Sequence, residues 1–275
     1  QPIHTMSKKL EIKWYETTDS TNNRAIEGAS EAPDRFTWAA DFQSAGRGQR
    51  GNKWISKAGD NLMFSILFKP GFISAQEQFA ISQICTLGLF NYLKAKGINA
   101  KIKWPNDVYV GDRKICGILI ENVVTGDNLS QSISGIGLNI NQRVFPSNVP
   151  NPTSMVLEIE SKRANKSVKF DTHKELPELL AEIFKEYDAA RKEHDRNGNF
   201  KKLTKRYLSA LYRIGEYHKY SDLTEEEDKT VEIKKGKVFE AKIVGIDENS
   251  CLVLETKKGE RKTFAFKEIS YILNS

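Results

Sequence analysis

Apolar residues recur with two different periods along residues 12–212, and each period predicts its own kind of element. Short alternating or continuous apolar runs predict strands. The run NLMFSILF at 61–68 is apolar almost throughout, which is typical of a central strand that is buried on both faces. The predicted strands lie at 12–16, 36–42, 61–68, 98–104, 108–110, 114–121 and 133–140.

Helix signals lie between and after these strands. The string DSTN at 19–22 supplies capping residues for a short helix that stops by Gly28. Ser74 and Glu77 form a capping-box pattern for a long helix that is expected to run to Lys96. Two further helices are expected at 172–192 and 200–212.

The pattern changes after residue 215. Residues 216–230 are polar and charged, and we expect a linker there. Short alternating segments follow at 230–234, 238–246, 251–255 and 262–266, separated by Gly- and Asn-containing turns, which favours a small β-barrel of hairpins. The sequence therefore predicts an α+β protein, with a mixed β-sheet and helices at 6–215 and a barrel domain at 226–275.

Composition narrows the class of protein. Hydrophobic residues make up 39% of the 275-residue chain, enough for a core, and the net charge of +6 allows an acidic ligand without arguing for nucleic acid. Cys85, Cys116 and Cys251 lie far apart in apolar runs, so we expect reduced core residues and neither a disulfide framework nor a zinc site. No apolar run has membrane-spanning length and no signal peptide opens the sequence, so we expect a soluble cytoplasmic protein.

Two polar segments carry the candidate chemistry. SAGRGQRGNKW at 44–54 combines glycines, which let backbone N–H groups approach a ligand, with arginines, which offer forked donors to carboxylate or phosphate. KWPND at 103–107 places a cation, a ring and a carboxylate at a tight turn. Together they indicate a site for an anionic small molecule and a nucleotide. The spacing excludes a Rossmann fingerprint and a P-loop, because no Gly-x-Gly-x-x-Gly opens a helix and no Gly-Lys-Ser/Thr is present.

Each of these strings also has a plain structural interpretation. A glycine-rich basic loop is often an exposed hairpin turn, and Pro-Asn-Asp favours a type I turn between strands. DSTN is most often a helix cap, and Lys114, which follows Arg113 in a hairpin, is typical of a solvated charge. Asn139 and Asn141 can merely end a strand. The joint occurrence of the strings, in order and within one domain, argues against these interpretations.

In this order the strings resemble those of biotin protein ligases. The resemblance runs from about residue 12 to the end of the sequence and is weakest between 142 and 225. It implies a catalytic domain related to class II aminoacyl-tRNA synthetases, followed by an SH3-like barrel. It also implies biotin and ATP as substrates, Mg²⁺ as the metal and a biotin carboxyl carrier domain as the partner. The matching strings are DSTN at 19–22, QSAGRGQRGNKW at 43–54, NLMFSI at 61–66, KWPNDVYV at 103–110, RKICGILIE at 113–121 and GIGLNIN at 135–141.

The resemblance implies roles for individual residues. Lys114, Lys103 and Arg47 would be catalytic by neutralising charge, and Asp107 would hold the metal. Glycines of the last two strands would leave room for the biotin tail, and Trp54 would be a wall or stacking surface for adenine. The residues expected at biotin are Ser20, Thr21, Asn22, Gln43, Gly46, Arg47, Gly48, Lys114, Gly117, Gly135 and Gly137. Those expected at ATP or the adenylate are Gln49, Arg50, Asn52, Lys53, Trp54, Lys103, Asn106 and Asn139.

The chemistry of these residue types agrees with that assignment. Attack of the biotin carboxylate on the α-phosphate of ATP brings two anions together, so cations must neutralise charge. The product, biotinyl-5′-AMP, is a mixed anhydride, and a closing glycine-rich loop would protect it from water. A lysine of the acceptor protein then attacks the carbonyl and releases AMP, so the nucleophile belongs to the partner.

Two features depart from well-known members of the family. Gln49 stands where bacterial members carry an arginine, and a neutral amide cannot replace a guanidinium in holding an anionic adenylate. Either Arg50 or Lys53 takes that role, or the intermediate is held differently. Only 18 residues precede Asp19, too few for a three-helix helix-turn-helix domain, so we expect a monofunctional ligase that binds no DNA. The sequence leaves the oligomeric state open, with a homodimer among the alternatives.

Two other functions stay open on sequence grounds. A lipoate or octanoyl protein ligase of the same superfamily would place a different acyl group on a related fold. A nucleic-acid-binding module could use the basic loop together with the interleaved Lys262, Phe264 and Phe266, although such alternation is what any barrel strand shows.

Overall fold

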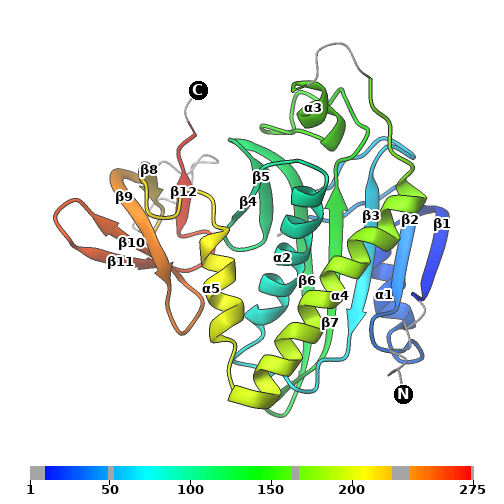
Figure 1. The fold of residues 1–275 in the computed structure, drawn as a ribbon, viewed down its shortest axis with the longest axis horizontal. Coiled ribbons are helices and arrows are strands. Elements are labelled where there is room, and N and C mark those ends of the chain that lie inside the picture. Colours follow the sequence, from blue (N-terminus) through cyan, green and yellow to red (C-terminus); the bar gives the residue numbers. More distant parts are fainter. Residues whose placement is uncertain (1–9, 49–52, 163–166, 225–235, 274–275) are drawn as a thin grey trace, which may run out of the picture.

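A seven-stranded sheet organises the larger part of the molecule (Figure 1). The computed structural model describes residues 10–48, 53–162, 167–224 and 236–273, and within them the strand order is β1-β2-β3-β7-β6-β5-β4. β1 and β2 are parallel and each other neighbouring pair is antiparallel, so the predicted mixed sheet is confirmed. The strands are β1 Ile12–Thr18, β2 Thr37–Gln43, β3 Leu62–Phe68, β4 Ala100–Lys103, β5 Asp107–Val110, β6 Arg113–Thr125 and β7 Asn128–Leu138.

Helices lie on both faces of this sheet. α2 and α4 cover one face and α1 packs on the other (Figure 1). Side-chain alternation in β3 explains the division, because Phe64 and Ile66 belong to the main core whereas Leu67 packs with Ala25 of α1 in a smaller one. The helices are α1 Thr21–Gly28, α2 Phe79–Ala95, α3 Met155–Glu160, α4 Thr172–Asn197 and α5 Lys201–Ser209.

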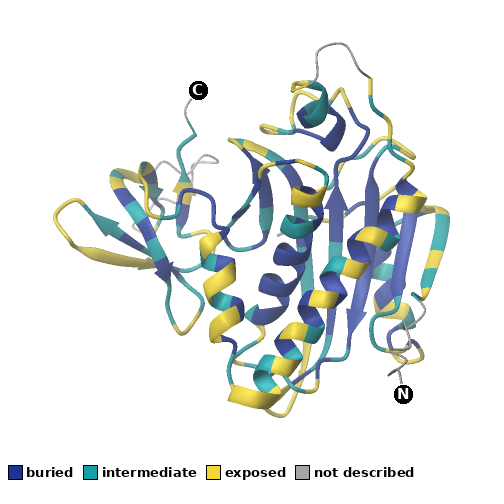
Figure 2. Ribbon diagram, in the orientation of Figure 1, coloured by how far each residue is buried: buried dark blue, intermediate teal, exposed yellow. Residues whose placement is uncertain are grey.

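α2 and α4 pack closely over the covered face. A Cβ on Gly88 of α2 would lie 2.6 Å from the Cα of Ile183 in α4, so only glycine permits this approach. Figure 2 shows the inner sides of both helices buried and the outer side of α4 exposed. α2 is buried around most of its circumference, which explains why its sequence is apolar on nearly all sides.

The start of α2 differs from the prediction. Ser74 and Glu77 do exchange the two capping-box hydrogen bonds, at 3.3 and 3.4 Å, but α2 begins only at Phe79. The intervening backbone forms i-to-i+3 hydrogen bonds, and the N–H of Ala75 donates to the carbonyl of Asp127 in the β6–β7 turn. This first turn is therefore not α-helical.

Two further differences lie after β7. α4 continues to Asn197, past its predicted end at 192, and stops at Gly198, whose φ of 63° suits glycine. α3 was not predicted, because a helix of one and a half turns shows too little periodicity to stand out. Its N-cap, Ser154, accepts a hydrogen bond from the N–H of Leu157.

A five-stranded antiparallel sheet follows, in the order β11-β10-β9-β8-β12. It begins with Tyr217–Asp222, so the prediction of a linker at 216–230 was wrong for residues 217–222. The segment is polar overall, yet Tyr220 and Asp222 alternate into the interior, which is the pattern of a half-buried strand. The sheet thus starts before the predicted boundary at 226, and the SH3-like barrel and the two domain ranges stay predictions. The strands are β8 Tyr217–Asp222, β9 Lys237–Ile246, β10 Leu252–Thr256, β11 Arg261–Phe264 and β12 Ile269–Tyr271.

The C-terminal sheet packs against the turn between β4 and β5. Trp104 Nε1 donates to the carbonyl of Ser250 at 3.0 Å, and its ring meets that of Phe266 edge-on. Arg213 Nη1 donates to the carbonyl of Ile272 at 3.0 Å. These contacts bring the end of the chain beside the KWPND string.

Two predictions made from the sequence concern the cysteines and membrane-spanning segments. Cys85 and Cys116 are free and buried, as predicted, and burial raises the pKa of Cys85 to about 12. Cys251 is free but only half-buried, so its expected core position was wrong. No helix within the described residues is long and apolar enough to cross a bilayer.

Candidate active site

A cavity of about 290 Å³ opens on the face of the large sheet that α2 and α4 leave uncovered. It lies between the start of α1, the glycine-rich loop, strands β4 to β7 and the turn before β12. Fourteen of the predicted site residues line it: Ser20, Thr21, Asn22, Gln43, Arg47, Gly48, Lys53, Trp54, Lys103, Asp107, Lys114, Gly117, Gly135 and Gly137. Five lining residues were not predicted: Ile118, Leu119, Ile136, Phe266 and Lys267.

One end of the cavity is a hydrogen-bonding cluster at the start of α1. The backbone N–H and the hydroxyl of Thr21 donate to Gln43 Oε1 at 2.8 and 3.1 Å. The hydroxyl of Ser65 lies 2.7 Å from Thr21 Oγ1 and 2.6 Å from Asn22 Oδ1. Sequence reasoning missed Ser65, although a lone hydroxyl in the apolar stretch LMFSILF was a signal that the strand meets a polar group there.

Glu121 of β6 ties the loop to this cluster, and sequence reasoning also missed it. Its carboxylate accepts from Asn22 Nδ2 at 2.8 Å and from both terminal nitrogens of Arg47, at 2.7 and 3.2 Å. Arg47 Nη1 also donates to Asn23 Oδ1 at 3.1 Å. The guanidinium therefore sits in a bidentate ion pair at the rim of the cavity, with 40% of the side chain exposed.

The floor of the cavity is made by glycines and covered by Trp54. Gly117 and Gly137 are paired across β6 and β7, and a Cβ on Gly137 would collide with the indole ring of Trp54. The N–H of Trp54 donates to the carbonyl of Gly46, which places the ring here, while its Nε1 is buried without a hydrogen-bond partner among the described residues. The space over Gly135 is filled by the side chain of Asn22. In this structure the glycines thus make room for side chains of the protein, where the sequence suggested a biotin tail.

The other end of the cavity is cationic. Lys114 Nζ lies 2.9 Å from Asp107 Oδ2, so this lysine is paired and is not a solvated hairpin charge. Lys103 Nζ lies between two rings, 5.2 Å from the centroid of Tyr109 and 4.7 Å from that of Tyr271. Burial lowers the pKa of Lys103, because removal from water disfavours the charged ammonium.

Three described residues of the predicted set stand apart from the cavity wall. Asn106 and Asn139 are buried and donate to backbone carbonyls, of Ile118 at 3.2 Å and Thr153 at 3.0 Å, so both brace neighbouring backbone. Gly46 lies behind Trp54. Gln49, Arg50 and Asn52 lie outside the described residues. No cluster of three or more metal-ligating side chains occurs in the described part of the chain, so Asp107 has no preformed set of protein ligands around it.

Comparison with known families identifies the part of the chain that builds this cavity. Residues 14–139 match the biotin/lipoate A/B protein ligase family. This chain carries a domain of that family. The domain includes the hydrogen-bonding cluster, the glycine floor and the cationic end described above.

Two relatives illustrate the extent of the similarity. The bifunctional ligase/repressor BirA of Bacillus subtilis is 28% identical over 254 residues, which cover 92% of this chain and 71% of that protein. The biotin–[acetyl-CoA-carboxylase] ligase of Paracoccus denitrificans is 36% identical over 128 residues, which cover 45% of this chain and 52% of that protein. The chain thus spans about half the length of the second relative.

Solved structures share the whole architecture, including the C-terminal sheet. The biotin protein ligase of Aquifex aeolicus in complex with biotin and ATP superposes with a TM-score of 0.71 at 24% identity, over 94% of this chain and 97% of that one. The Leishmania major biotin protein ligase in complex with biotinyl-5-AMP gives a TM-score of 0.59 at 18% identity, over 94% and 99%. The mixed α+β fold is that of the biotin protein ligases.

Proposed function

We propose that this protein activates biotin with ATP as biotinyl-5′-AMP and transfers the biotinyl group to a lysine of a biotin carboxyl carrier protein. The observation that carries the proposal is the polarity of the cavity, which has hydrogen-bonding groups of Thr21, Asn22 and Gln43 at one end and the cations Lys103 and Lys114 at the other. The ureido group of biotin needs donors and acceptors, and its carboxylate needs cations. The relatives described above act on biotin by name.

The first half-reaction requires neutralisation of charge. The biotin carboxylate is already ionised at neutral pH, so its attack on the α-phosphate needs no general base. Lys114 and Lys103 stand where the carboxylate and phosphate would meet, and each positioned cation stabilises the charge that accumulates as the two anions approach. Asp107 would supply a hard oxygen ligand for a Mg²⁺ ion that accompanies the nucleotide phosphates, and that ion would neutralise part of their charge.

The second half-reaction uses a nucleophile from the partner. The amine of the acceptor lysine attacks the carbonyl of the mixed anhydride, an amide bond forms, and AMP leaves with the electron pair of the broken bond. Until the partner arrives, water must be kept from the anhydride. Trp54 covers the glycine floor of the cavity and the Arg47–Glu121 pair lies at its rim, and we assign this protection to them.

The hydrogen-bonding end of the cavity favours biotin over a lipoyl or octanoyl group. A dithiolane ring or an alkyl chain would leave Thr21, Asn22 and Gln43 facing groups that neither donate nor accept. A site built from such partners rejects an apolar analogue strongly, because its buried polar groups would lose their hydrogen bonds.

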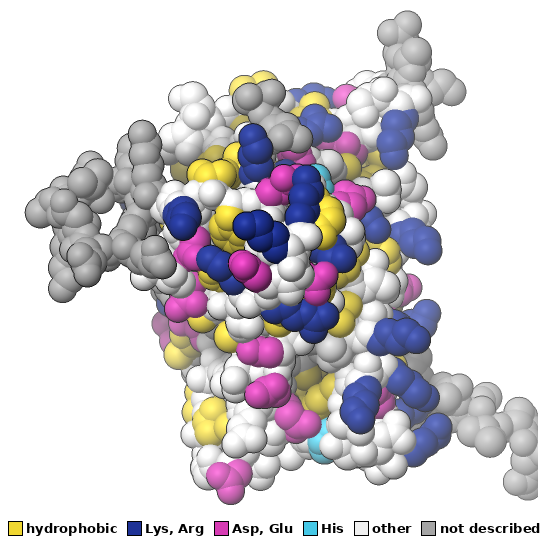
Figure 3. All heavy atoms as spheres, turned by 90° about the vertical axis from the view of Figure 1, so that its left-hand side faces the viewer, with side chains coloured by type: hydrophobic (Ala, Val, Ile, Leu, Met, Phe, Trp, Pro, Cys, Tyr) yellow, Lys and Arg dark blue, Asp and Glu magenta, His cyan; other side chains and the backbone are white. Residues whose placement is uncertain are grey.

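The surface of the C-terminal sheet does not favour the nucleic-acid alternative. Figure 3 looks onto this end of the molecule and shows Lys and Arg side chains interspersed with Asp and Glu. Lys262 pairs with Asp222 at 3.6 Å, Phe264 is buried, and Phe266 lines the cavity. Phe266 is 37% exposed but belongs to the cavity wall, so the two rings do not form a continuous exposed stacking surface.

The test measures biotin-dependent ATP–pyrophosphate exchange, with lipoate and octanoate in parallel, followed by transfer to a carrier domain. The proposal expects exchange and transfer with biotin alone. Exchange with lipoate or octanoate in place of biotin would overturn it. Two further expectations accompany the proposal, a cytoplasmic location and no binding of DNA. Sedimentation with and without biotin and ATP would decide between a monomer and a homodimer.

A further inference from the structure

Lys114, which the proposed function places at the reacting anions, lies at an irregular point of the large sheet. Lys114 pairs with Tyr109 of β5. The next pair joins Cys116 to Val108, so Ile115 is an extra residue in β6. A bulge of this kind bends the strand and changes the direction of the neighbouring side chains. Pairing with β5 therefore does not by itself fix where the Lys114 side chain points.

A separate segment of the chain holds the backbone of Lys114. β7 pairs with β6 only as far as Cys116, and residues 151–153 lie parallel to the start of β6 at Lys114. The N–H of Lys114 donates to the carbonyl of Asn151 at 2.7 Å, and its carbonyl accepts from the N–H of Thr153 at 2.9 Å. Both backbone hydrogen-bonding groups of Lys114 are thus paired with this segment. The position of Lys114 depends on where residues 151–153 lie.

Glu158 of α3 joins this segment to the start of β6. Its Oε1 accepts a hydrogen bond from the hydroxyl of Thr153 at 2.5 Å and lies 2.8 Å from Nη2 of Arg113. The Glu158 side chain is only 5% exposed, so the carboxylate has exchanged most of its water for protein donors. One buried oxygen therefore connects the residue before Lys114 with the segment that pairs with Lys114.

Asn139 fastens the same segment at the end of β7. Its Nδ2 donates to the carbonyl of Thr153 at 3.0 Å, and its own carbonyl accepts from the N–H of Met155 at 3.1 Å. The N–H of Asn139 in turn donates to the carbonyl of Ile115, the extra residue of β6. The bulge, the segment and the first turn of α3 thus form one connected structure behind Lys114.

We infer that Glu158 is a positioning residue of the first half-reaction and acts through Lys114. The inference rests on the proposed function and concerns a residue that does not line the cavity. In that step an oxygen of the biotin carboxylate bonds to the α-phosphorus, the bond from phosphorus to the bridging oxygen breaks, and its electron pair leaves with the pyrophosphate. The Lys114 ammonium must lie beside the reacting anions as this happens, and misplacement of such a group by about 1 Å can cost about 10²-fold in rate.

The first test removes the contacts of Glu158 with little change of shape. Glu158→Gln keeps the length of the side chain and removes the charge that holds Arg113. Thr153→Val removes the hydroxyl, whereas Thr153→Ser keeps it. We expect kcat of biotin-dependent ATP–pyrophosphate exchange to fall about tenfold in Glu158→Gln and severalfold in Thr153→Val, and to stay close to the wild type in Thr153→Ser.

A double-mutant cycle separates an effect through Lys114 from a general effect on the fold. Lys114→Ala should retain about one hundredth of the wild-type rate. In that background Glu158→Gln should cause no further loss, because there is no ammonium group left to position. Independent effects would multiply and lower the rate about tenfold more. The measurement is formation of biotinyl-5′-AMP in a single turnover with enzyme in excess.

Glu186→Gln is the matched control. The Glu186 side chain of α4 is only 4% exposed and pairs at 2.6 Å with Arg206 of α5, which is about as exposed as Arg113. Glu186 does not line the cavity and has no contact with the segment at 151–153 among those described above. Its replacement should lower the melting temperature and leave kcat of the folded enzyme unchanged.

Three results would overturn the inference. They are an unchanged kcat in Glu158→Gln and Thr153→Val, effects that multiply with Lys114→Ala, and an equal loss of kcat in Glu186→Gln. If Glu158→Gln does not fold, the comparison of Thr153→Val with Thr153→Ser decides, with and without Lys114→Ala. Absence of biotin-dependent exchange in the wild type would count against the proposed function itself, which is a separate failure.

Discussion

Two arginine–carboxylate pairs lie on opposite faces of the large sheet. They share the same chemistry but differ in the exposure of the arginine and in the residues around it. Arg35 pairs with Asp188 of α4 on the covered side, and Arg47 pairs with Glu121 of β6 on the open side. Both pairs are bidentate. The Arg35 side chain is only 14% exposed, whereas that of Arg47 is 40% exposed; the carboxylates show the opposite order, with Asp188 49% and Glu121 30% exposed.

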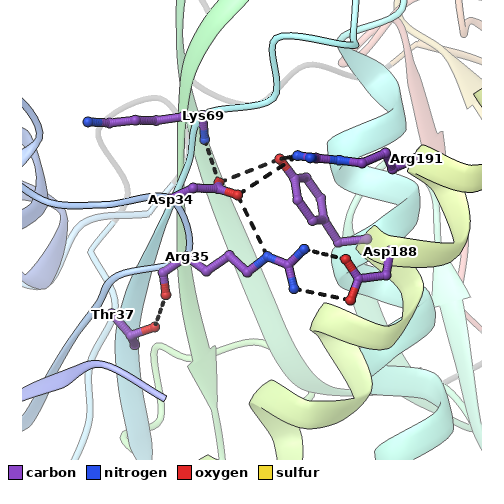
Figure 4. Close-up of polar contacts among 7 residues, drawn as sticks. Asp34, Arg35, Thr37, Lys69, Asp188 and Arg191 are labelled. Carbon is purple, nitrogen blue, oxygen red and sulfur yellow. Dashed lines mark hydrogen bonds and ion pairs between the residues drawn. The ribbon is translucent and has the colours of Figure 1, made fainter. Parts of the chain in front are cut away.

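The covered pair belongs to a closed network (Figure 4). Arg35 reaches from the loop before β2 to Asp188, and its other side faces Asp34. Asp34 in turn accepts from the backbone N–H of Lys69 at 2.8 Å and approaches Arg191. The guanidinium also lies over the ring of Tyr187, so the network fixes α4 to the ends of β2 and β3.

The open pair has a different setting. Its arginine comes from a glycine-rich loop, and its carboxylate lies at the rim of a cavity whose described wall contains four lysines, Lys53, Lys103, Lys114 and Lys267. The comparison teaches that an arginine-rich sequence motif does not reveal the role of its arginines until the burial of each side chain is known. A buried arginine that is held by several fixed partners stabilises a fold, while a more exposed arginine at a cavity can be rearranged by a ligand.

The largest effect is expected when Lys114, a cation of the open face, is removed. Lys114→Ala should lower the rate of adenylate formation by about 10²-fold, since one positioned charge in a transition state is worth about 3 kcal/mol. Its melting temperature should stay within a degree or two of the wild type, because a half-exposed ion pair contributes little. Wild-type rates of pyrophosphate exchange in this variant would remove Lys114 from the site.

On the covered face we expect the opposite result, a loss of stability without a loss of catalytic rate. Arg35→Ala should lower the free energy of unfolding by about 2 kcal/mol, because it removes the bidentate partner of Asp188 and the nearer of the two arginines beside Asp34, while kcat of the folded enzyme stays unchanged. Urea denaturation measures the first quantity and pyrophosphate exchange the second. Arg191→Ala is the matched control and should cost less, since that arginine is 43% exposed and lies 3.9 Å from Asp34. Equal losses in the two variants would show that burial does not set the difference.

A smaller effect is expected when the open pair is broken. Glu121→Gln should increase escape of biotinyl-5′-AMP by up to about fivefold, because an exposed pair contributes at most about 1 kcal/mol. The measurement is biotin attached to an unrelated protein mixed with the enzyme. Arg47→Gly should raise this labelling further, since it removes the cation as well as the pair. Glu27→Gln, an acid of α1 that pairs with Arg24, serves as the control. Labelling unchanged in both site variants would mean that the pair does not retain the intermediate.

The smallest effect concerns Asp19, which precedes the hydrogen-bonding cluster. A hydrogen bond from Asn23, with further ones from the backbone of Ser20 and from Thr18, lowers the pKa of Asp19 to about 2 from 3.8. The carboxylate therefore adds stability above about pH 4, and this is lost as the pH falls towards 2. Asp19→Asn should flatten the acid limb of the melting-temperature curve between these values. An acid limb identical to that of the wild type would show that Asp19 adds nothing, and Glu31→Gln, at an exposed position, is the control.

Much of this protein followed from local sequence patterns. Alternation and apolar runs predicted all seven strands of the large sheet, and capping residues and a following Gly predicted α1. The ordered strings also predicted that Asn22, Arg47, Lys114 and Gly137 belong to one cavity. The strand and helix predictions succeeded because strand and helix periods are set by a few neighbouring residues, whereas the grouping of the four site residues followed from the resemblance of the ordered strings to those of a known family.

Other features were decided only when distant segments met. Nothing near Glu121 in the sequence shows that its carboxylate will hold both Asn22 and Arg47, because those contacts span 99 and 74 residues. Nor could the sequence show that Trp54 covers the glycine floor, or that Lys267 of the turn before β12 and Tyr271 of β12 border the cationic end. Such contacts depend on strand register and on the packing of one sheet against the other, which are summed over many residues and leave no local period in the chain.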